Sequence, residues 1–425
     1  MSFLLKFDRK ATGRATRLKK AVVASFYSTS AEVEARFAEF HASDWNRILY
    51  WLDISGLALY LLDRLALLGL ERCLPDPIRM RFQQDLADNR MRTQALFDEA
   101  AAISEEMSRR GISFALLKGI TLAPDSVPDC ALRWQIDLDL LVAAADATAA
   151  RHVLMTHGYS LHAVCGNSME FTAGQSGAPD MRKIYRVHSQ RSLELHMLST
   201  TAARDGVRAD RLSRTRLRDF GGAIIPTLSP ADILVQQSVH LFKHLCGEHT
   251  RASWVLEFWR HVEVRKGDTA FWGEVERIAA MEPQGVIALG AALLLSALMF
   301  GGAAQKELAR RAVTKLPNNV RLWIETFGTR VLFADSPGNK LYLILRQELR
   351  NGTPNRPAIR KLIFPAHLPP AVTHGEPGER FGERMTRYRT ETRFLFSRLQ
   401  FHIVEGLRYA IELSRWQRRL TETSR

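Results

Sequence analysis

Cysteine is scarce in this chain, and the spacing of its cysteines does not match that of a structural metal site. The 425 residues contain four cysteines, far apart and without a C-x-x-C pair: Cys73, Cys130, Cys165 and Cys246. Structural zinc sites and disulfide frameworks need regularly spaced cysteines, so both are excluded as the basis of the fold. An apolar secretory segment is also missing, because Lys6 and Asp8 interrupt the first residues. We therefore expect a cytoplasmic protein.

Several catalytic signatures are missing as well. The sequence has no G-x-x-x-x-G-K-[ST] phosphate loop, and no Ser-His-Asp or Cys-His arrangement stands out. His240 and His244 have the i, i+4 spacing of a zinc pair on a predicted helix, but "HLFKH" lacks the glutamate of a metalloprotease helix. We interpret them as a core or surface pair.

Only one segment is apolar enough to be weighed as a membrane span. Residues 283–305, "PQGVIALGAALLLSALMFGGAAQ", carry no charge and are long enough to cross a bilayer. Glycines interrupt the segment, alanine fills many of its positions, and no aromatic belt flanks it. A helix buried on all sides of a helical domain gives the same pattern, and we favour that interpretation.

Positive charge is concentrated at the two ends of the chain. The net charge is +14. Residues 1–30 carry seven Lys/Arg against one Asp, and residues 340–425 carry seventeen Lys/Arg against eight Glu, so the middle is nearly neutral. Basic ends favour peripheral contact with an anionic membrane, a nucleic acid or an acidic partner protein. Helix faces that are simply hydrated explain the same charge.

The hydrophobic periodicity divides the chain into helical and mixed regions. Apolar residues recur at helical spacing before residue 110 and again after residue 226, whereas short strand-like runs lie between. We expect strands at 112–117, 136–142, 183–189 and 192–198, a helix at 143–158 and a surface loop at 166–179. The predicted fold is therefore α+β, in five parts: a basic N-terminal segment (1–42), a helical region (43–110), a small mixed-sheet core (111–225), a helical domain (226–335) and an Arg-rich C-terminal region (336–425).

Two carboxylates interrupt the apolar run "LRWQIDLDLLV" at residues 132–142. Side chains alternate faces on a strand, so Asp137 and Asp139 share one face while Leu138 and Leu140 bury the other. Two anions so close would repel each other unless a cation lay between them. Oxygen ligands at this spacing suit Mg²⁺ together with substrate phosphates. Alone, the pattern is equally explained by a strand end that faces water.

The flanking segments strengthen this prediction. Upstream, "FALLKG" is a strand that runs into Gly119, where backbone N–H groups can hold a phosphate oxygen. Downstream, "LELH" places a third carboxylate, Glu194, on another strand. We expect His196 to point away from Glu194 and to serve in packing or in supporting a ligand.

These segments resemble a bacterial family of uncharacterised nucleotidyltransferases, related to the abortive-infection type within the polymerase-beta-like superfamily. The family shows a G-I-x-hydrophobic-x-x-L-K-G segment, an R-x-x-x-D-h-D-h-L-V segment and an h-E/D-L-H-W segment. Here they are "GISFALLKG" (111–119), "RWQIDLDLLV" (133–142) and "LELHM" (193–197), and the similarity extends over roughly residues 43–300. The chain departs from the pattern after Gly119, where the turn is shortened, at Met197 and at Glu257.

The resemblance implies a small mixed-sheet core that moves a nucleoside monophosphate from an NTP to an acceptor hydroxyl or phosphate. Asp137, Asp139 and Glu194 would then be the catalytic carboxylates and would hold Mg²⁺ or Mn²⁺ ions. Gly119 would bind the NTP phosphates, and Lys118 and Arg133 would offset charge on the pyrophosphate. Lys118 is equally explained as a lysine whose stem covers a strand end.

Two other classes of function stay open. A metal-dependent glycosyltransferase also uses D-x-D to bind a nucleotide-sugar, although it would place a nucleotide-binding region where this chain is helical. A degenerate member could act as a basic scaffold or binding module, which the intact carboxylates disfavour. The acceptor could be a peptide, a saccharide, an RNA or a small molecule, and we expect no transmembrane span.

Overall fold

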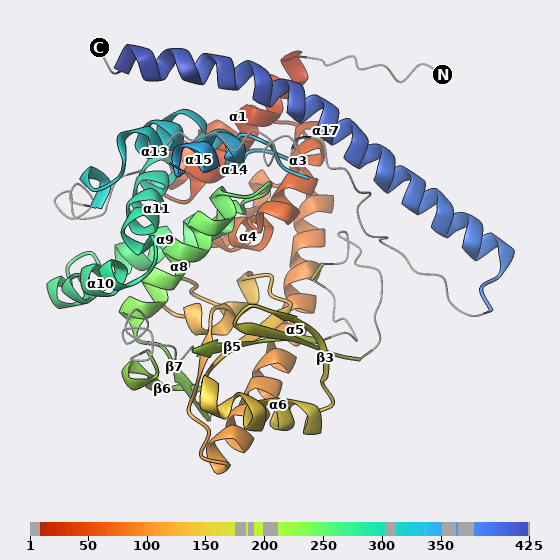
Figure 1. Cartoon of the computed structure of the whole chain (residues 1–425). Helices are drawn as coiled ribbons and strands as arrows, with labels where there is room; N and C mark the ends of the chain where they lie inside the picture. Colours follow the sequence, from red (N-terminus) through yellow and green to blue (C-terminus); the bar gives the residue numbers. More distant parts are fainter. Residues whose placement is uncertain are drawn as a thin grey trace.

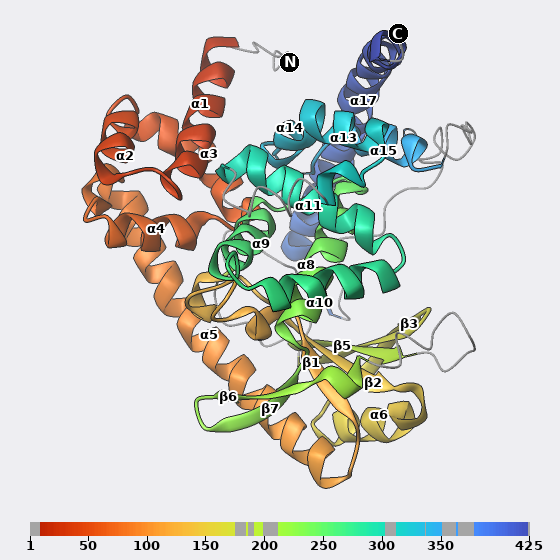
Figure 2. The ribbon, with the colours of Figure 1, turned by 90° about the vertical axis from the view of Figure 1, so that its left-hand side faces the viewer.

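The chain folds into a mixed sheet and a large body of helices. The structure is a computed structural model that describes residues 9–174, 184–185, 191–198, 211–301, 312–335, 337–350, 363 and 378–423. In two perpendicular views the sheet occupies one end of the molecule and most helices occupy the other (Figures 1 and 2). The predicted α+β class is therefore confirmed.

The sheet has seven strands in the order β3-β4-β5-β2-β1-β7-β6. Its centre is mixed, because β2 pairs antiparallel with β1 but parallel with β5, and β1 pairs parallel with β7. The strand bounds are β1 Phe114–Leu117, β2 Asp137–Ala143, β3 Ser160–Cys165, β4 Ser168–Ala173, β5 Arg191–Leu198, β6 Arg216–Phe220 and β7 Ala223–Thr227.

Each face of the sheet has its own core. Leu138 and Leu140 pack in one cluster with the second half of α5 (Asp76–Arg109) and with α6 (Ala147–Thr156). Leu141 belongs to the other cluster, which joins the sheet to the helical body. The alternation of β2 therefore directs Asp137 and Asp139 toward the helical body.

Helices precede the sheet, as predicted for residues 43–110, and Gly56 divides the first part of this region into two helices. Gly56 ends α3 with a φ of 74°, a left-handed conformation that glycine adopts without strain, and α4 begins two residues later. At the other end, Gly111 follows α5 with a φ of 68°. The helices before α5 are α1 Arg9–Ser25, α2 Ser30–Phe37, α3 Ala42–Ser55 and α4 Ala58–Leu67.

The helical body follows the sheet. The segment "LSPADILVQQ" predicts a helix start, with Ser229 as the cap and Pro230 at the first helical position. The structure confirms this prediction, because Ser229 accepts a hydrogen bond from Asp232 N and Pro230 is the first residue of α8. The uncharged segment forms the mostly buried α11, and within the described residues no helix is long and apolar enough to cross a membrane. The bounds are α8 Pro230–Leu245, α9 Ala252–Val264, α10 Thr269–Met281, α11 Gly285–Phe300, α13 Asn318–Trp323, α14 Thr329–Leu332, α15 Tyr342–Glu348 and α17 Phe381–Thr423.

Short helical turns connect these elements. Five are 3₁₀ turns and η7 is a π-helical turn: η1 Glu71–Cys73, η2 Gly119–Leu122, η3 Cys130–Leu132, η4 Ala144–Asp146, η6 Leu212–Arg214 and η7 Ile324–Gly328.

The structure corrects two expectations for the sheet. The segment 166–179 was expected to be a loop, but β4 occupies part of it, because Met169, Phe171 and Ala173 alternate inward between polar residues. The β6–β7 hairpin was not predicted. Of the strand expected at 183–189, the structure describes Ile184 and Tyr185, which form a turn, and the remaining positions lie outside the described residues.

Candidate active site

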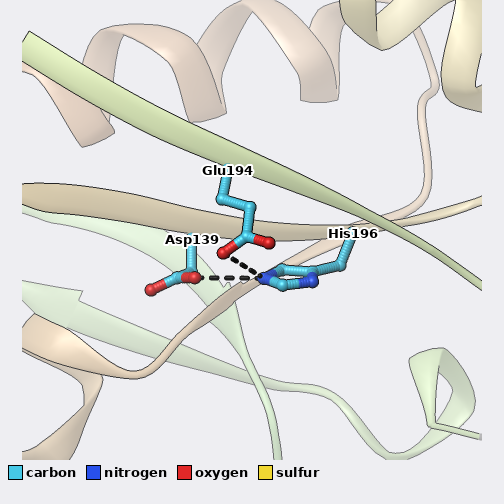
Figure 3. Close-up of side chains that lie close together, drawn as sticks. All are labelled: Asp139, Glu194 and His196. Atoms are coloured by element: carbon cyan, nitrogen blue, oxygen red, sulfur yellow. Dashed lines mark hydrogen bonds and ion pairs between the residues drawn. The ribbon is translucent and has the colours of Figure 1, made fainter. Parts of the chain in front are cut away.

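The centre of the sheet brings three polar side chains together. β2 and β5 are parallel neighbours whose register pairs Asp139 with Glu194 and Leu141 with His196. Figure 3 shows the Asp139 and Glu194 carboxylates and the His196 imidazole pointing toward one another. The His196 Nε2 atom lies 3.0 Å from Asp139 Oδ1 and 3.4 Å from Glu194 Oε2. Two strands far apart in the sequence thus form one cluster.

The position of His196 contradicts the sequence expectation. Glu194 and His196 are two residues apart on β5, so the two-residue period of a strand places them on the same face. The expectation that His196 points away from Glu194 misapplied this period and is wrong. His196 contacts the carboxylates directly and is a residue of the site.

Asp139 is buried, with 4% of its surface exposed, and it contacts a lysine. Lys118 follows β1, whose antiparallel register sets Leu117 opposite Asp139, and its Nζ lies 2.7 Å from Asp139 Oδ1. Burial alone would raise the pKa of Asp139, but the hydrogen bonds from His196 and Lys118 lower it to about 2. Burial would likewise lower the pKa of Lys118, and Asp139 raises it. The carboxylate is therefore charged and paired.

Asp137 stands beside this cluster without belonging to it. Among the described residues, one group of side chains offers ligand atoms within 4.8 Å of one another, namely Asp139, Glu194 and His196. Asp137 is half-buried on the same face of β2 and lines the adjacent cavity. Burial and the nearby Asp139 raise its pKa. The metal-ligating atoms that the structure gathers are thus centred on Asp139 and Glu194.

Gly119 has a backbone conformation and a neighbouring side chain that both favour glycine. It has a φ of 49°, and a Cβ built on it would overlap the side-chain amide of Gln135. Gln135 Nε2 in turn donates to the Asp137 carbonyl at 2.7 Å. The preceding Lys118 also has a φ of 49°, which is uncommon for a residue with a side chain. The close approach of Gln135 therefore accounts for the glycine.

A cavity of about 190 Å³ opens beside the carboxylates, between the sheet and helices α8 and α9. Arg251 lies in it with its Cζ 4.1 Å from the ring centre of Trp134 and 5.3 Å from that of Trp254. The lining residues are Leu116, Leu117, Lys118, Gly119, Leu122, Arg133, Trp134, Gln135, Ile136, Asp137, Asp139, Leu228, Ile233, Gln236, Gln237, His240, Arg251, Trp254 and Glu257.

Two residues that line this cavity have buried side-chain donors without acceptors. Trp134 Nε1 and Gln236 Nε2 are buried and have no hydrogen-bond partner in the described part of the chain. Burial lowers the pKa of Arg251 to about 10, a value at which the guanidinium still carries its charge near neutral pH. A cation and two unsatisfied donors favour an anionic, acceptor-rich occupant. Sequence reasoning missed these residues, because they come from three separate segments with no shared motif.

Arg133 lies in the same wall but is already paired. Its Nε is 3.3 Å from Glu257 Oε2, and the hydroxyl of Tyr60 donates to Glu257 Oε1 at 3.0 Å. Burial would lower the pKa of Arg133, but the Glu257 carboxylate raises it. The structure thus brings Arg133 to the site as part of a buried network and not as a free cation.

The histidine pair on α8 packs against an aromatic ring. The ring centres of His240 and His244 lie 4.7 and 4.4 Å from that of Trp254. Burial lowers the pKa of His240 to about 2 and that of His244 to about 4. Both rings are therefore neutral, and the prediction of a packed pair is confirmed.

The strand β1 runs into the Gly119 turn, and the next two strands on one side of it, β2 and then β5, carry the carboxylates Asp137, Asp139 and Glu194. The chain belongs to the family described as "Uncharacterised nucleotidyltransferase", whose model matches residues 41–301. The chain matches no curated protein. A solved structure titled as an antigenic nucleotidyltransferase-like protein from Paracoccidioides brasiliensis matches 45% of this chain and 90% of its own, at 11% identity and a TM-score of 0.28.

Proposed function

We propose that this nucleotidyltransferase moves a nucleoside monophosphate from an NTP to an acceptor hydroxyl or phosphate. The observation that carries the proposal is the parallel pairing of β2 with β5, which sets Asp139 beside Glu194 at the edge of a cavity lined by Lys118 and Gly119. An acceptor oxygen forms a bond to the α-phosphorus, the bond from that phosphorus to the bridging oxygen breaks, and pyrophosphate leaves. The hydroxyl proton passes to water.

The donor set fits a divalent cation. Two carboxylates and one imidazole nitrogen lie within 4.8 Å of one another, and carboxylate oxygens are the preferred ligands of Mg²⁺ and suit Mn²⁺. Asp139, Glu194 and His196 supply these gathered ligand atoms, and Asp137, which stands beside them on the same face of β2, would join Asp139 and Glu194 in holding the metal. When bound, Mg²⁺ or Mn²⁺ supplies charge neutralisation for the triphosphate and lowers the pKa of an acceptor hydroxyl.

The chain's own residues position the nucleotide. The Lys118 ammonium lies at the edge of the cavity, where it neutralises phosphate oxygens. The backbone of Gly119 lets the triphosphate approach the sheet closely. Arg251 and the unsatisfied donors of Trp134 and Gln236 bind the acceptor-rich remainder of the nucleotide. Arg133 holds its place in the wall through Glu257 and contributes positive potential to the pyrophosphate from there.

The test is nucleotidyl transfer by the purified chain. It is incubated with Mg²⁺ or Mn²⁺ and each α-³²P-labelled NTP in the presence of a cell extract, and labelled products and pyrophosphate are followed. Asp137→Asn/Asp139→Asn should lower the rate by at least about 100-fold. An exposed pair of charged residues far from the site, Glu105→Gln/Arg109→Gln on α5, is the control for a general effect of charge removal. No transfer with any NTP, together with release of sugar from a nucleotide-sugar, would instead favour a glycosyltransferase.

The labelled product also identifies the acceptor. A peptide, a saccharide, an RNA and a small molecule are separated by their mobility and by their sensitivity to protease or ribonuclease. We propose that the reaction takes place in the cytoplasm and that the core of residues 111–225 works together with the helical domain of residues 226–335, since the cavity is lined by both.

A further inference from the structure

The C-terminal helix α17 has one face fixed against the helical body. Tyr409 and Trp416 are buried there, and Trp416 Nε1 donates to Glu348 Oε1 at 2.7 Å. Arg330 pairs with the buried Glu412 at 2.9 Å. These contacts determine which side of the 43-residue helix faces outward. Figure 1 shows its C-terminal part lying along the other helices and its first part extending past them.

The outward face carries a continuous line of large apolar side chains. All of them are about half exposed or more: Phe381 (76%), Met385 (53%), Tyr388 (53%), Phe396 (71%), Leu399 (55%), Ile403 (48%), Leu407 (64%) and Ile411 (56%). We call these eight residues the outer stripe. From Phe381 to Ile411 it extends for about 45 Å at 1.5 Å per residue. Exposed apolar lines of this length mark an interaction surface.

The spacing of the outer stripe keeps it on one side of a straight helix. Tyr388 and Leu399 are eleven residues apart, as are Met385, Phe396 and Leu407. Eleven residues make about three turns at 3.6 residues per turn, so the line drifts little over its length. A heptad repeat would instead impose the left-handed supercoil of a two-stranded coiled coil. The stripe therefore stays on one side of the helix along its length, as contact with an extended surface requires.

The charges around the outer stripe are of one sign. Successive residues of an α-helix are rotated by about 100° around its axis. Measured around the axis, Arg389, Arg393 and Arg418 therefore project within about 80° of the direction that Met385 and Ile403 share. The five glutamates of α17 lie farther around the helix, at about 100° or more. All three arginines are exposed. The outward half of the helix is therefore apolar and positively charged.

We propose that the outer stripe and its arginines bind the surface of an anionic lipid membrane. A helix that lies in the membrane interface combines an apolar line with basic residues on its flanks, and anionic lipids supply the opposite charge. Pairing with a second copy would bring arginine toward arginine without a facing carboxylate. The proposal is independent of nucleotidyl transfer.

The experiment is vesicle flotation of the full chain without nucleotide. The vesicles are either phosphatidylcholine alone or phosphatidylcholine with one quarter phosphatidylglycerol. We expect binding to the anionic vesicles, lowered at least about tenfold by Phe396→Ser/Ile403→Ser. The triple change of Arg389, Arg393 and Arg418 to Gln should lower it on the order of 100-fold, at about fivefold for each arginine. Binding should weaken as salt is raised.

A matched control removes apolar residues elsewhere. Leu217 and Ile224 on the β6–β7 hairpin are 73% and 58% exposed, so Leu217→Ser/Ile224→Ser removes similar exposed surface and should leave flotation unchanged. Circular dichroism verifies that each variant is folded. Failure to float with either vesicle, or equal binding to both vesicles, would overturn the proposal. A dimer in light scattering that Phe396→Ser/Ile403→Ser converts to a monomer would also overturn it, because the outer stripe would then be the interface with a second copy of the chain.

Discussion

The pairing of Arg133 with Glu257 predicts a stability effect that separates a structural role for this arginine from a catalytic one. Sequence reasoning assigned Arg133 to the pyrophosphate, whereas the structure places it 3.3 Å from a buried carboxylate. We expect Glu257→Gln to destabilise the fold, because it leaves a guanidinium in the cavity wall without its counter-charge.

The expected magnitude follows from burial. The side chains of Glu257 and Arg133 are 2% and 15% exposed, and removing one partner of a buried ion pair costs about 3–5 kcal/mol. We take the lower end, about 3 kcal/mol, because Arg133 borders the cavity and water there can reach it. Tyr60→Phe removes only a hydrogen bond to the charged Glu257 and should cost about 1.5–3 kcal/mol.

Urea unfolding at neutral pH measures these free energies. A double-mutant cycle of Arg133→Met, Glu257→Leu and Arg133→Met/Glu257→Leu is made in the Tyr60→Phe background, so that no hydroxyl loses its acceptor. Replacing both charges by apolar groups of similar volume is often neutral, so the double variant should lie within about 1 kcal/mol of Tyr60→Phe alone. The reasoning is refuted if Glu257→Gln costs less than about 1 kcal/mol, or if the double variant is as unstable as the two single changes together. If the double variant is stable and transfers nucleotide at the normal rate, Arg133 has no role at the pyrophosphate.

Three further predictions follow from single positions. Gly119→Ala should abolish transfer, because its Cβ would displace Gln135, and nucleotide titration would show whether binding is lost with it. Lys118→Met should weaken NTP binding by on the order of tenfold in equilibrium dialysis, whereas Lys118→Arg should restore part of it. Burial lowers the pKa of His261 from 6.5 to about 4, so the unfolded chain gains a proton before the folded chain does as pH falls. The free energy of unfolding should therefore drop by about 1.4 kcal/mol per pH unit between pH 6 and 4. Urea titrations of His261→Gln over this pH range should show a flatter dependence of that free energy on pH.

Local chemistry accounts for most of what the sequence predicted correctly. The strand of Asp137 and Asp139 follows from strict alternation between leucines, and the start of α8 follows from a serine cap followed by proline. The buried α11 follows from an uncharged run too rich in glycine and alanine to indicate a membrane span. Each signal lies within about 20 residues, and each depends on backbone or solvation preferences that do not need the rest of the fold.

Contacts between distant segments could not be obtained in this way. Arg133 and Glu257 are 124 residues apart, and nothing in either segment indicates the other. Arg251 and Trp134 likewise come from distant segments that meet only in the folded chain. Glu194 was assigned correctly as a carboxylate near Asp139, but the parallel register that sets them opposite each other is a property of the whole sheet. Pairings of this kind are decided by tertiary packing.

The turn of Lys118 and Gly119 connects the folding of the site to its proposed chemistry. A non-glycine residue at a φ of 49° costs about 1–3 kcal/mol, and the ion pair with Asp139 offsets this cost. The same pair stabilises a carboxylate that would otherwise be buried alone, so the chain can fold with the site already formed. A divalent cation at Asp139 would replace the ammonium as its counter-charge. Lys118 would then be free to turn toward the cavity, where the phosphates of the proposed substrate lie.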